Sequence, residues 1–434
     1  MTKPASLNKI TRLTQSPKVI NRDEHNISRS DISENALKVL YRLKNAGYKS
    51  CLVGGAVRDL LLGLKPKDFD IVTDARPEQI RELFRNCRLI GRRFRLAHVR
   101  FGDEIIEVST FRAAHHVTDG DRHSNDGRII RDNVYGDIED DVWRRDFTVN
   151  ALFYNIENFS IIDYVGGLAD IESRQLRLIG NAAARYREDP VRMLRAVRFA
   201  VKLGFEIHPS TIQPIVEHEK LLADIPPARL FEEFMKLFLH GRALLMLHQL
   251  RRYDLFRHLF PETNEMLMHE KDGAVKNLLE RVLSNTDVRI AEDKPVTPAF
   301  LIAAFLWFPM LQRTEEYISN GLSEQDAIQL ASDAVISRQV SSIAIPRRYT
   351  LMAREIWGLQ YRLKHNKGSK PYRLVSHPKF RAGYDFMLMR SQAGEHLQEL
   401  VDWWSTFIES NNGLLHGHDV HGKSGNRRYR RHKR

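Results

Sequence analysis

Apolar positions in the first third of the chain alternate between a period of two and a period near 3.6, which indicates mixed strands and helices. Helical spacing in "ENALKVLYRL" is followed by "YKSCLVGG", which predicts a strand entering a glycine turn. "AVRDLLLG" then predicts a helix, and "DFDIVT" predicts a second strand. Two further strand-like runs meet at Gly102 and Asp103, a pair typical of hairpin turns. We therefore expect a small sheet with helices on one face.

Farther along the chain, helical periodicity dominates and strand signals are scarce. Amphipathic segments such as "IPPARLFEEFMKLFLHG" and "TLMAREIWGLQYRL" alternate with Pro and Gly turns. The most apolar run, "PAFLIAAFLWFPML" at 298–311, is shorter than the roughly 20 residues that span a bilayer. It predicts a buried helix. The predicted fold class is α+β, with a small mixed-sheet head followed by an all-helical neck and body.

These patterns divide the chain into consecutive parts. We expect a mobile N-terminal arm over 1–28, a head over 29–175, a helical neck over 176–240, a helical body over 241–412 and a disordered basic tail over 413–434. The tail includes "KSGNRRYRRHKR", in which seven residues are Lys or Arg. Such a tail either adds non-specific affinity for a polyanion or acts only as a solubilising segment.

Charge and cysteine content narrow the possible classes of protein. The 434 residues carry 67 Lys or Arg against 55 Asp or Glu, a net charge of +12 with a pI near 9.6. This excess favours nucleic acid as a partner, although a merely basic surface or affinity for an acidic membrane also explains it. The two cysteines, Cys51 and Cys87, form no zinc-binding spacing and no disulfide framework. The N-terminal residues lack the apolar core of a secretory signal, so we predict a cytoplasmic protein.

Two aspartates stand one residue apart in the predicted strand "DFDIV". The strand period places Asp68 and Asp70 on one face and Phe69 and Ile71 on the other. Neighbouring carboxylates repel each other unless a cation lies between them, and such hard oxygen ligands suit Mg²⁺ or Mn²⁺. Two solvated aspartates at a strand end are the simpler alternative, and the motif alone does not exclude it.

A glycine turn upstream favours the metal site over the two solvated aspartates. Gly54 and Gly55 follow a predicted strand and open a predicted helix, and Arg58 lies one turn into that helix. Glycines let phosphate oxygens approach backbone N–H groups closely. A Gly-Gly pair alone is often only a tight turn. A phosphate cradle beside a metal site, in contrast, is typical of phosphoryl or nucleotidyl transfer.

Two residues are candidates for a third carboxylate. Glu107 lies in the apolar run "EIIEVSTF", where an acidic side chain is unusual unless it binds a metal or pairs with a cation. Asp146 in "WRRDFTVNAL" follows Arg144 and Arg145, which either pair with it or face triphosphate oxygens.

A further cluster, "REDPVRMLRAVRFA", places acidic and basic side chains at helical spacing. Arg192 and Arg195 are three residues apart and share a helix face. One interpretation is a solvated face with Asp–Arg pairs. The other is that Asp189 and Arg192 present an acceptor and donors to a base edge.

Together these motifs resemble one class of nucleotidyltransferases. "LVGGAVRDLLLG", "DFDIVT", "RRDFTVNAL", "YVGG" and "REDPVRMLRAVRFA" stand in the order and spacing of the class that includes bacterial poly(A) polymerases and tRNA CCA-adding enzymes. The resemblance covers about residues 30–240. "LFRNCRLIGRRFRLAHVRFG", "IPPARLFEE", "HPKFRAGYDFMLMR" and the basic tail resemble the bacterial poly(A) polymerases within that class.

The resemblance implies template-independent transfer of AMP from ATP to RNA 3′ ends, with release of pyrophosphate, a two-metal mechanism and a role in RNA decay. It implies that Asp68 and Asp70 bind the catalytic Mg²⁺ or Mn²⁺, that Asp146 belongs to the active site and that Glu107 is a further metal ligand. It also implies a set of residues that hold ATP or support its loop: Gly54, Gly55, Arg58, Asp59, Arg145, Asn150, Asp189, Arg192 and Arg195.

Two alternatives remain open at this stage. A tRNA CCA-adding enzyme would use the same chemistry, and Asp189 with Arg192 does not by itself select adenine over cytosine. An RNA-binding protein with an inactive transferase head is the second alternative, although the intact Asp-x-Asp argues against it. The expected RNA partners are mRNA and other transcripts. The sequence does not identify RNA-decay proteins that bind the chain.

Overall fold

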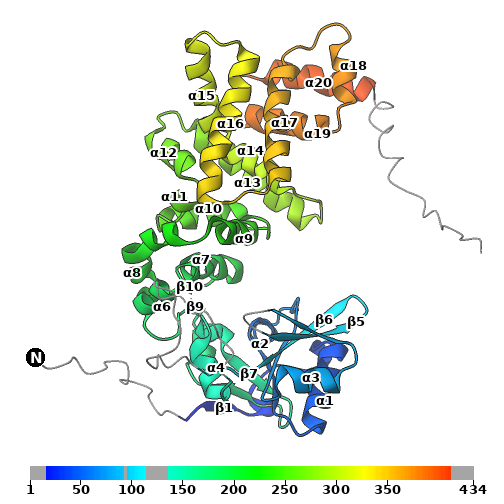
Figure 1. The fold of residues 1–434 in the computed structure, drawn as a ribbon, viewed down its shortest axis with the longest axis vertical. Helices are drawn as coiled ribbons and strands as arrows, with labels where there is room; N and C mark the ends of the chain where they lie inside the picture. Colours follow the sequence, from blue (N-terminus) through cyan, green and yellow to red (C-terminus); the bar gives the residue numbers. More distant parts are fainter. Residues whose placement is uncertain (1–15, 92–94, 114–134, 412–434) are drawn as a thin grey trace, which may run out of the picture. The chain divides into compact units, whose positions relative to one another are not determined.

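The computed structural model describes residues 16–91, 95–113 and 135–411 (Figure 1). The chain separates into two compact units, which divide between His218 and Glu219, within the segment predicted as a neck. The predicted boundaries of the head, neck and body stay predictions. The first part of the predicted arm and the predicted basic tail lie outside the described residues.

The first unit is built around an eight-stranded mixed sheet with the strand order β1-β8-β7-β2-β3-β6-β5-β4. Only β3 and β6 pair in parallel; the other neighbours in this sheet are antiparallel. β5 and β6 form the predicted hairpin, so its turn at Gly102 and Asp103 is confirmed. The strands are β1 (Lys18–Ile20), β2 (Ser50–Val53), β3 (Asp70–Thr73), β4 (Cys87–Ile90), β5 (Leu96–Phe101), β6 (Glu104–Thr110), β7 (Leu152–Asn155) and β8 (Ile161–Asp163).

The helices of this unit alternate with the strands and then follow them. A short parallel pair, β9 (Gln175–Leu176) with β10 (Glu206–Ile207), interrupts the segment predicted to be all helical. The helices are α1 (Glu34–Asn45), α2 (Gly55–Leu61), α3 (Pro77–Leu83), α4 (Ile138–Arg144), α5 (Gly167–Glu172), α6 (Ala182–Glu188), α7 (Val191–Leu203) and α8 (Pro209–His218), with 3₁₀ turns η2 (Arg22–Glu24), η3 (Arg29–Asp31) and η4 (Thr148–Asn150).

The segment predicted as a mobile N-terminal arm contains a strand. Residues Lys18–Ile20 form β1 and pair antiparallel with β8, and Ile20 is buried. The sequence "KVI" is too short to show a period, but it satisfies the backbone groups of an otherwise open sheet edge. The prediction of a mobile arm reaching residue 28 is therefore wrong for this stretch.

Helices cover both faces of the sheet, whereas one covered face was expected. Ser50 donates a hydrogen bond to the Leu40 carbonyl of α1 on one face. Cys51 and Val53 point to the other face, where they pack in a buried cluster with Val142 of α4. Successive side chains of β2 are all buried, so each face of this strand needs a covering layer.

The second unit contains only helices in its described residues, 219–411. The run "PAFLIAAFLWF" forms α14 and the start of α15 and is almost wholly buried, as predicted. No described helix is both long and apolar enough to cross a membrane. The elements are η5 (Glu219–Asp224), α9 (Pro227–Phe238), α10 (Ala243–Arg252), α11 (Phe256–Leu259), α12 (Pro261–His269), α13 (Ala274–Ala291), α14 (Pro298–Phe305), α15 (Trp307–Ser319), α16 (Glu324–Ser342), α17 (Arg347–Leu363), α18 (Lys370–Val375), α19 (Phe380–Gln392) and α20 (Gln398–Ser410).

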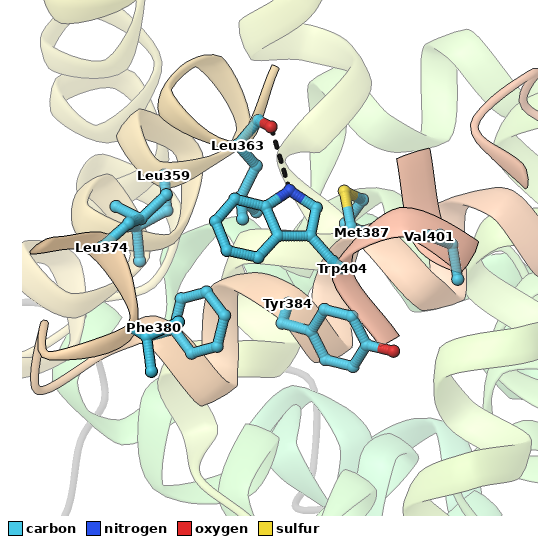
Figure 2. Close-up of a cluster of buried hydrophobic side chains, with 9 residues drawn as sticks. Leu359, Leu363, Leu374, Phe380, Tyr384, Met387, Val401 and Trp404 are labelled. Carbon is cyan, nitrogen blue, oxygen red and sulfur yellow. Dashed lines mark hydrogen bonds between the residues drawn. The ribbon is translucent and has the colours of Figure 1, made fainter. Parts of the chain in front are cut away.

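One core of the second unit gathers side chains from its last four helices (Figure 2). Trp404 of α20 is fully buried at the centre and donates its indole N–H to the Leu363 carbonyl at 3.0 Å. The bond satisfies the one polar atom of the ring, so this large side chain is buried without an unpaired donor.

Candidate active site

The candidate carboxylates meet where β3 begins. Asp70 is the first residue of β3 and pairs in register with Val53 of β2 and Glu107 of β6. Asp68 precedes the strand, so the prediction that both aspartates lie in one strand is wrong in detail. Both aspartates are exposed and Phe69 is buried, which keeps the carboxylates on the solvent side.

The acidic side chains at the start of β3 repel one another. The pKa of Asp70 is raised to about 6, mainly because the protein packed around its carboxyl desolvates it and also because Glu107 and Asp68 repel its charge, while Arg145 opposes the increase. Glu107 Oε1 also lies 3.6 Å from His98 Nε2 on β5. A divalent cation would relieve this repulsion, and carboxylate oxygens are the ligands that Mg²⁺ prefers. In 16–91, 95–113 and 135–411 there is no group of three or more His, Cys, Asp or Glu already close enough to hold a metal ion.

The glycine turn lies directly beside Asp70. Gly54 has φ of 75° and precedes α2, a conformation that favours glycine. A β-carbon added there would lie 3.7 Å from Arg145 NH1 and 4.0 Å from Asp70 Oδ2. Gly54 therefore brings bare backbone, a guanidinium group and a carboxylate together, as expected for a site that receives a phosphate.

Arg58 is buried rather than open to a ligand. Its side chain is 2% exposed, and its Nε and NH2 donate to Asp59 Oδ1 at 2.8 and 2.6 Å. Its NH1 donates to Asn150 Oδ1 of η4. The guanidinium group is thus already used to tie α2 to η4. Of the two roles implied for Arg58, support of the loop fits this geometry and direct contact with triphosphate does not.

A hydrogen-bonded chain continues from Asn150 to α7. Asn150 Nδ2 donates to Asp146 Oδ1 at 3.4 Å, and Asp146 Oδ2 accepts from Arg195 Nε at 2.9 Å. Burial alone would raise the pKa of Asp146, but Arg195 and these hydrogen bonds hold it below the usual range. The structure therefore brings together five predicted site residues in one network: Asp59, Arg58, Asn150, Asp146 and Arg195.

Arg145 belongs to a different pair. Its NH2 donates to Asp141 Oδ2 at 2.7 Å, one turn earlier on α4. Asp141 was not among the predicted site residues, although its spacing of four from Arg145 is a usable signal. The pair holds the Arg145 guanidinium near Gly54 and Asp70.

The predicted base-contact residues lie at the junction of α6 and α7. Arg192 NH1 donates to Glu188 Oε2 at 2.9 Å and to the Arg185 carbonyl at 2.7 Å. Asp189 Oδ1 accepts from the Val191 N–H at 3.2 Å. Arg185, which the sequence did not single out, donates to the Arg145 carbonyl at 2.6 Å. It thereby fixes this junction to the residues before Asp146.

The "YVGG" motif has a structural explanation. Asp163 is buried at the end of β8, and its carboxylate accepts hydrogen bonds from four successive backbone N–H groups, those of Val165, Gly166, Gly167 and Leu168. A β-carbon at Gly167 would lie 2.3 Å from the Thr148 carbonyl oxygen of η4. An Asp shortly before a Gly-Gly pair at a helix start was the available sequence signal.

Family models match three parts of the chain. Residues 50–177 match a family profile described as "Poly A polymerase head domain", and 320–434 match "Polymerase A arginine-rich C-terminus". Residues 204–267 match "Probable RNA and SrmB- binding site of polymerase A". Poly(A) polymerase I of Salmonella typhimurium is 51% identical over 399 residues, covering 90% of this chain and 86% of that protein. The chain belongs to the bacterial poly(A) polymerase I family. Poly(A) polymerase I of Haemophilus influenzae is 46% identical, and the match covers 91% of this chain and 88% of that protein.

Similarity to CCA-adding enzymes is more limited in sequence. The CCA-adding enzyme of Bacillus licheniformis is 40% identical but covers 49% of this chain and 52% of that protein. A solved structure of the Bacillus stearothermophilus CCA-adding enzyme in complex with CTP matches this chain with a TM-score of 0.56 at 26% identity. The match covers 86% of this chain and 82% of that protein. The α+β nucleotidyltransferase fold is confirmed. The chain is a polynucleotide adenylyltransferase whose activity is template-independent polyadenylation of RNA.

Proposed function

We propose that Asp68 and Asp70 bind the divalent cations of this reaction, with Mg²⁺ as the usual ion and Mn²⁺ as a substitute. The observation that supports this most strongly is the crowding of Asp70, Asp68 and Glu107, which together with the burial of its carboxyl group raises the pKa of Asp70 to about 6. A fold that holds carboxylates close together despite their mutual repulsion is typical of metal sites. Glu107 is the proposed additional ligand.

The metal ions would neutralise triphosphate charge and favour the ionised form of the attacking 3′-hydroxyl. The chain's own residues do the positioning. Gly54 and Gly55 admit the triphosphate close to the backbone, and the Arg145 guanidinium group, which lies beside Gly54, would contact its oxygens. Asp59, Arg58 and Asn150 hold that turn, while Asp146 and Arg195 connect it to α7.

The incoming adenine is proposed to lie at the junction of α6 and α7, against Asp189 and Arg192. The RNA 3′ end is proposed to reach the α-phosphate from the metal side, where its hydroxyl displaces pyrophosphate. The RNA substrates are mRNA and other transcripts, and the cellular place is the cytoplasm, where tailing promotes RNA decay. The positive net charge of +12 supports binding of RNA phosphates without sequence selection.

The test uses purified full-length chain, an RNA with a free 3′-hydroxyl, Mg²⁺ and each nucleoside triphosphate separately. We expect long tails with ATP, little incorporation of the other nucleotides and one pyrophosphate released for each AMP added. Asp68→Asn and Asp70→Asn should each slow AMP addition about 1,000-fold, which corresponds to roughly 4 kcal/mol of lost transition-state stabilisation.

Asp103→Asn is the matched control, because Asp103 is exposed in the β5–β6 turn and should leave the rate unchanged. Incorporation of CMP, or a stop after three additions, would indicate a CCA-adding enzyme. Full activity in either aspartate variant would refute the metal assignment. A wild-type chain that binds RNA but never extends it would have an inactive head.

A further inference from the structure

Three aromatic side chains of α18 and α20 form a contiguous surface, which we call the aromatic platform: Tyr372, Trp403 and Phe407. Tyr372 is 51% exposed, and its ring packs edge-on against Phe407 with centroids 5.0 Å apart. Phe407 is stacked on Trp403 at 5.1 Å with an interplanar angle of 12°. Trp403 and Phe407 are only partly buried. The platform therefore presents ring surface to solvent.

The buried core of the second unit supports the aromatic platform. Trp403 packs edge-on against Trp404 at 5.0 Å, and Trp404 is the buried centre of the core in Figure 2. The hydrogen bond from Trp404 to the Leu363 carbonyl fixes that ring. Rigid aromatic side chains lose little conformational entropy when a flat ligand stacks on them.

Three exposed cations stand close to Tyr372 in the sequence, on α18 and on the turn before it. Lys367, Lys370 and Arg373 are exposed and make no ion pair with any residue that the structure describes. Lys370 and Arg373 lie within two residues of Tyr372. Lys364, in contrast, is paired with Glu324 at 2.6 Å. Because the short helix that carries the exposed Tyr372 ring also carries exposed cations without ion pairs, this surface differs from a single exposed apolar residue.

The acidic residues nearby lie on the other helix. Glu399 and Asp402 are exposed on α20, and Glu399 precedes Trp403 by one turn. The exposed cations without ion pairs are therefore on the α18 side, and the exposed carboxylates are on the α20 side. A polyanion that used the platform would run its charges along α18 and place its flat groups on the rings.

We propose that the aromatic platform with Lys367, Lys370 and Arg373 binds single-stranded RNA upstream of the 3′ end that is being extended. Aromatic rings that stack bases, combined with cations that contact phosphates, are the usual means of binding single-stranded nucleic acid without sequence preference. The proposal rests on the proposed polyadenylation function, and it gives the growing tail a second binding surface, distinct from the carboxylate site.

Charge decides between the possible occupants. The chain's own C-terminal residues 423–434 include seven Lys or Arg, so they would be repelled by the cations of α18. An apolar protein partner would leave those cations unused at its edge. A phosphate backbone satisfies them, and every base offers a ring face to the platform.

The test measures binding of 5′-labelled oligo(A) of about 20 nucleotides to the full-length chain by fluorescence anisotropy. Tyr372→Ala should raise Kd about five-fold or more, since removal of one stacking ring has at least this effect. Tyr372→Phe keeps the ring and should retain the wild-type Kd. Ile318→Ala removes a side chain of similar exposure from α15 and is the control that should leave binding unchanged.

A second variant tests the phosphate interactions. Lys370→Gln combined with Arg373→Gln should reduce the slope of log Kd against log salt by about 0.7 for each phosphate that is no longer neutralised. Both side chains are exposed, so the fold should be kept, and thermal melting of every variant checks this. In extension assays, the Tyr372→Ala chain should release tails earlier, giving a shorter length distribution at equal enzyme and RNA concentration.

The outcomes separate the two proposals. Wild-type Kd in both Tyr372→Ala and the double variant would overturn the platform, as would an equal loss of affinity in Tyr372→Phe and Tyr372→Ala. If the wild-type chain binds oligo(A) through Tyr372 but adds no AMP, the platform stands and the proposed function fails. Cross-linking of a photoreactive oligo(A) to the peptide containing 367–375 would support the platform directly.

Discussion

Replacement of Arg58 by Met should destabilise the first unit more than it disturbs catalysis directly. The guanidinium group is 2% exposed and donates to Asp59 twice and to Asn150 once. Loss of one partner from a buried ion pair costs about 3–5 kcal/mol, because the remaining charge stays buried without compensation. For a unit of this size, each kcal/mol lowers Tm by about 2–4 °C, so the expected decrease is roughly 6–20 °C.

Differential scanning calorimetry of the full-length chain provides the measurement, since the transition of the first unit should move while that of the second unit stays. Arg81→Met is the matched control. Arg81 is exposed on α3 and makes no hydrogen bond or ion pair with the residues that the structure describes, so its removal should change Tm by less than about 2 °C.

The kinetic consequence distinguishes support from direct contact. The rate of AMP addition by the Arg58→Met chain should fall in proportion to the fraction of folded protein. Lowering the assay temperature should restore most of that rate. A variant that melts like the wild type but has a strongly raised KM for ATP would refute this reasoning. In that case the guanidinium group would serve the triphosphate rather than the loop.

Two further predictions concern the same region. Asp146→Asn should lower the free energy of unfolding by about 1.5–3 kcal/mol at neutral pH, because it removes the charge that hydrogen-bonds to the partly exposed Arg195. The pKa of Asp146 is lowered in the folded state, so its contribution is present above the unfolded value of about 4 and is lost as the pH falls through the folded-state pKa. Urea unfolding from pH 7 to pH 3 should therefore show that the difference in free energy of unfolding between wild type and variant becomes smaller at the acid end. A difference that stays constant with pH would contradict the assignment. Gly167→Ala should cost about 1–3 kcal/mol in the same urea assay because its β-carbon would meet the Thr148 carbonyl, whereas Gly358→Ala in α17, where an added β-carbon meets no neighbouring atom, is the control that should not destabilise.

Local sequence patterns predicted the elements that carry the site. The glycine turn, the helix after it and the strand that starts with Asp70 lie where periodicity placed them, because each depends on residues close in the chain. The solvent-facing placement of Asp68 and Asp70 was predicted for the same reason, although Asp68 proved to precede the strand, and their role as metal ligands stays a prediction. β1 escaped prediction because three residues are too few to show a period.

The roles of the arginines could not be predicted from local patterns. Arg58, Arg145 and Arg195 all stand in motifs that suggested contacts with ATP, yet each has a partner in the protein. Asn150, which Arg58 contacts, lies 92 positions farther along the chain, and Asp146 and Arg195 are 49 apart. Only folding brings such groups together.

The sequence by itself determined the chemistry of this protein: the paired aspartates, the bare glycine turn and the order of motifs that marks the nucleotidyltransferase class. The tertiary structure decided which charged side chains remain available to a ligand. Asp70 keeps its carboxylate open to solvent at the start of a central strand, whereas the Arg58 guanidinium group is already hydrogen-bonded in a buried network. The physical reason is that a charge is either solvated or paired, and burial by distant segments decides which of the two applies.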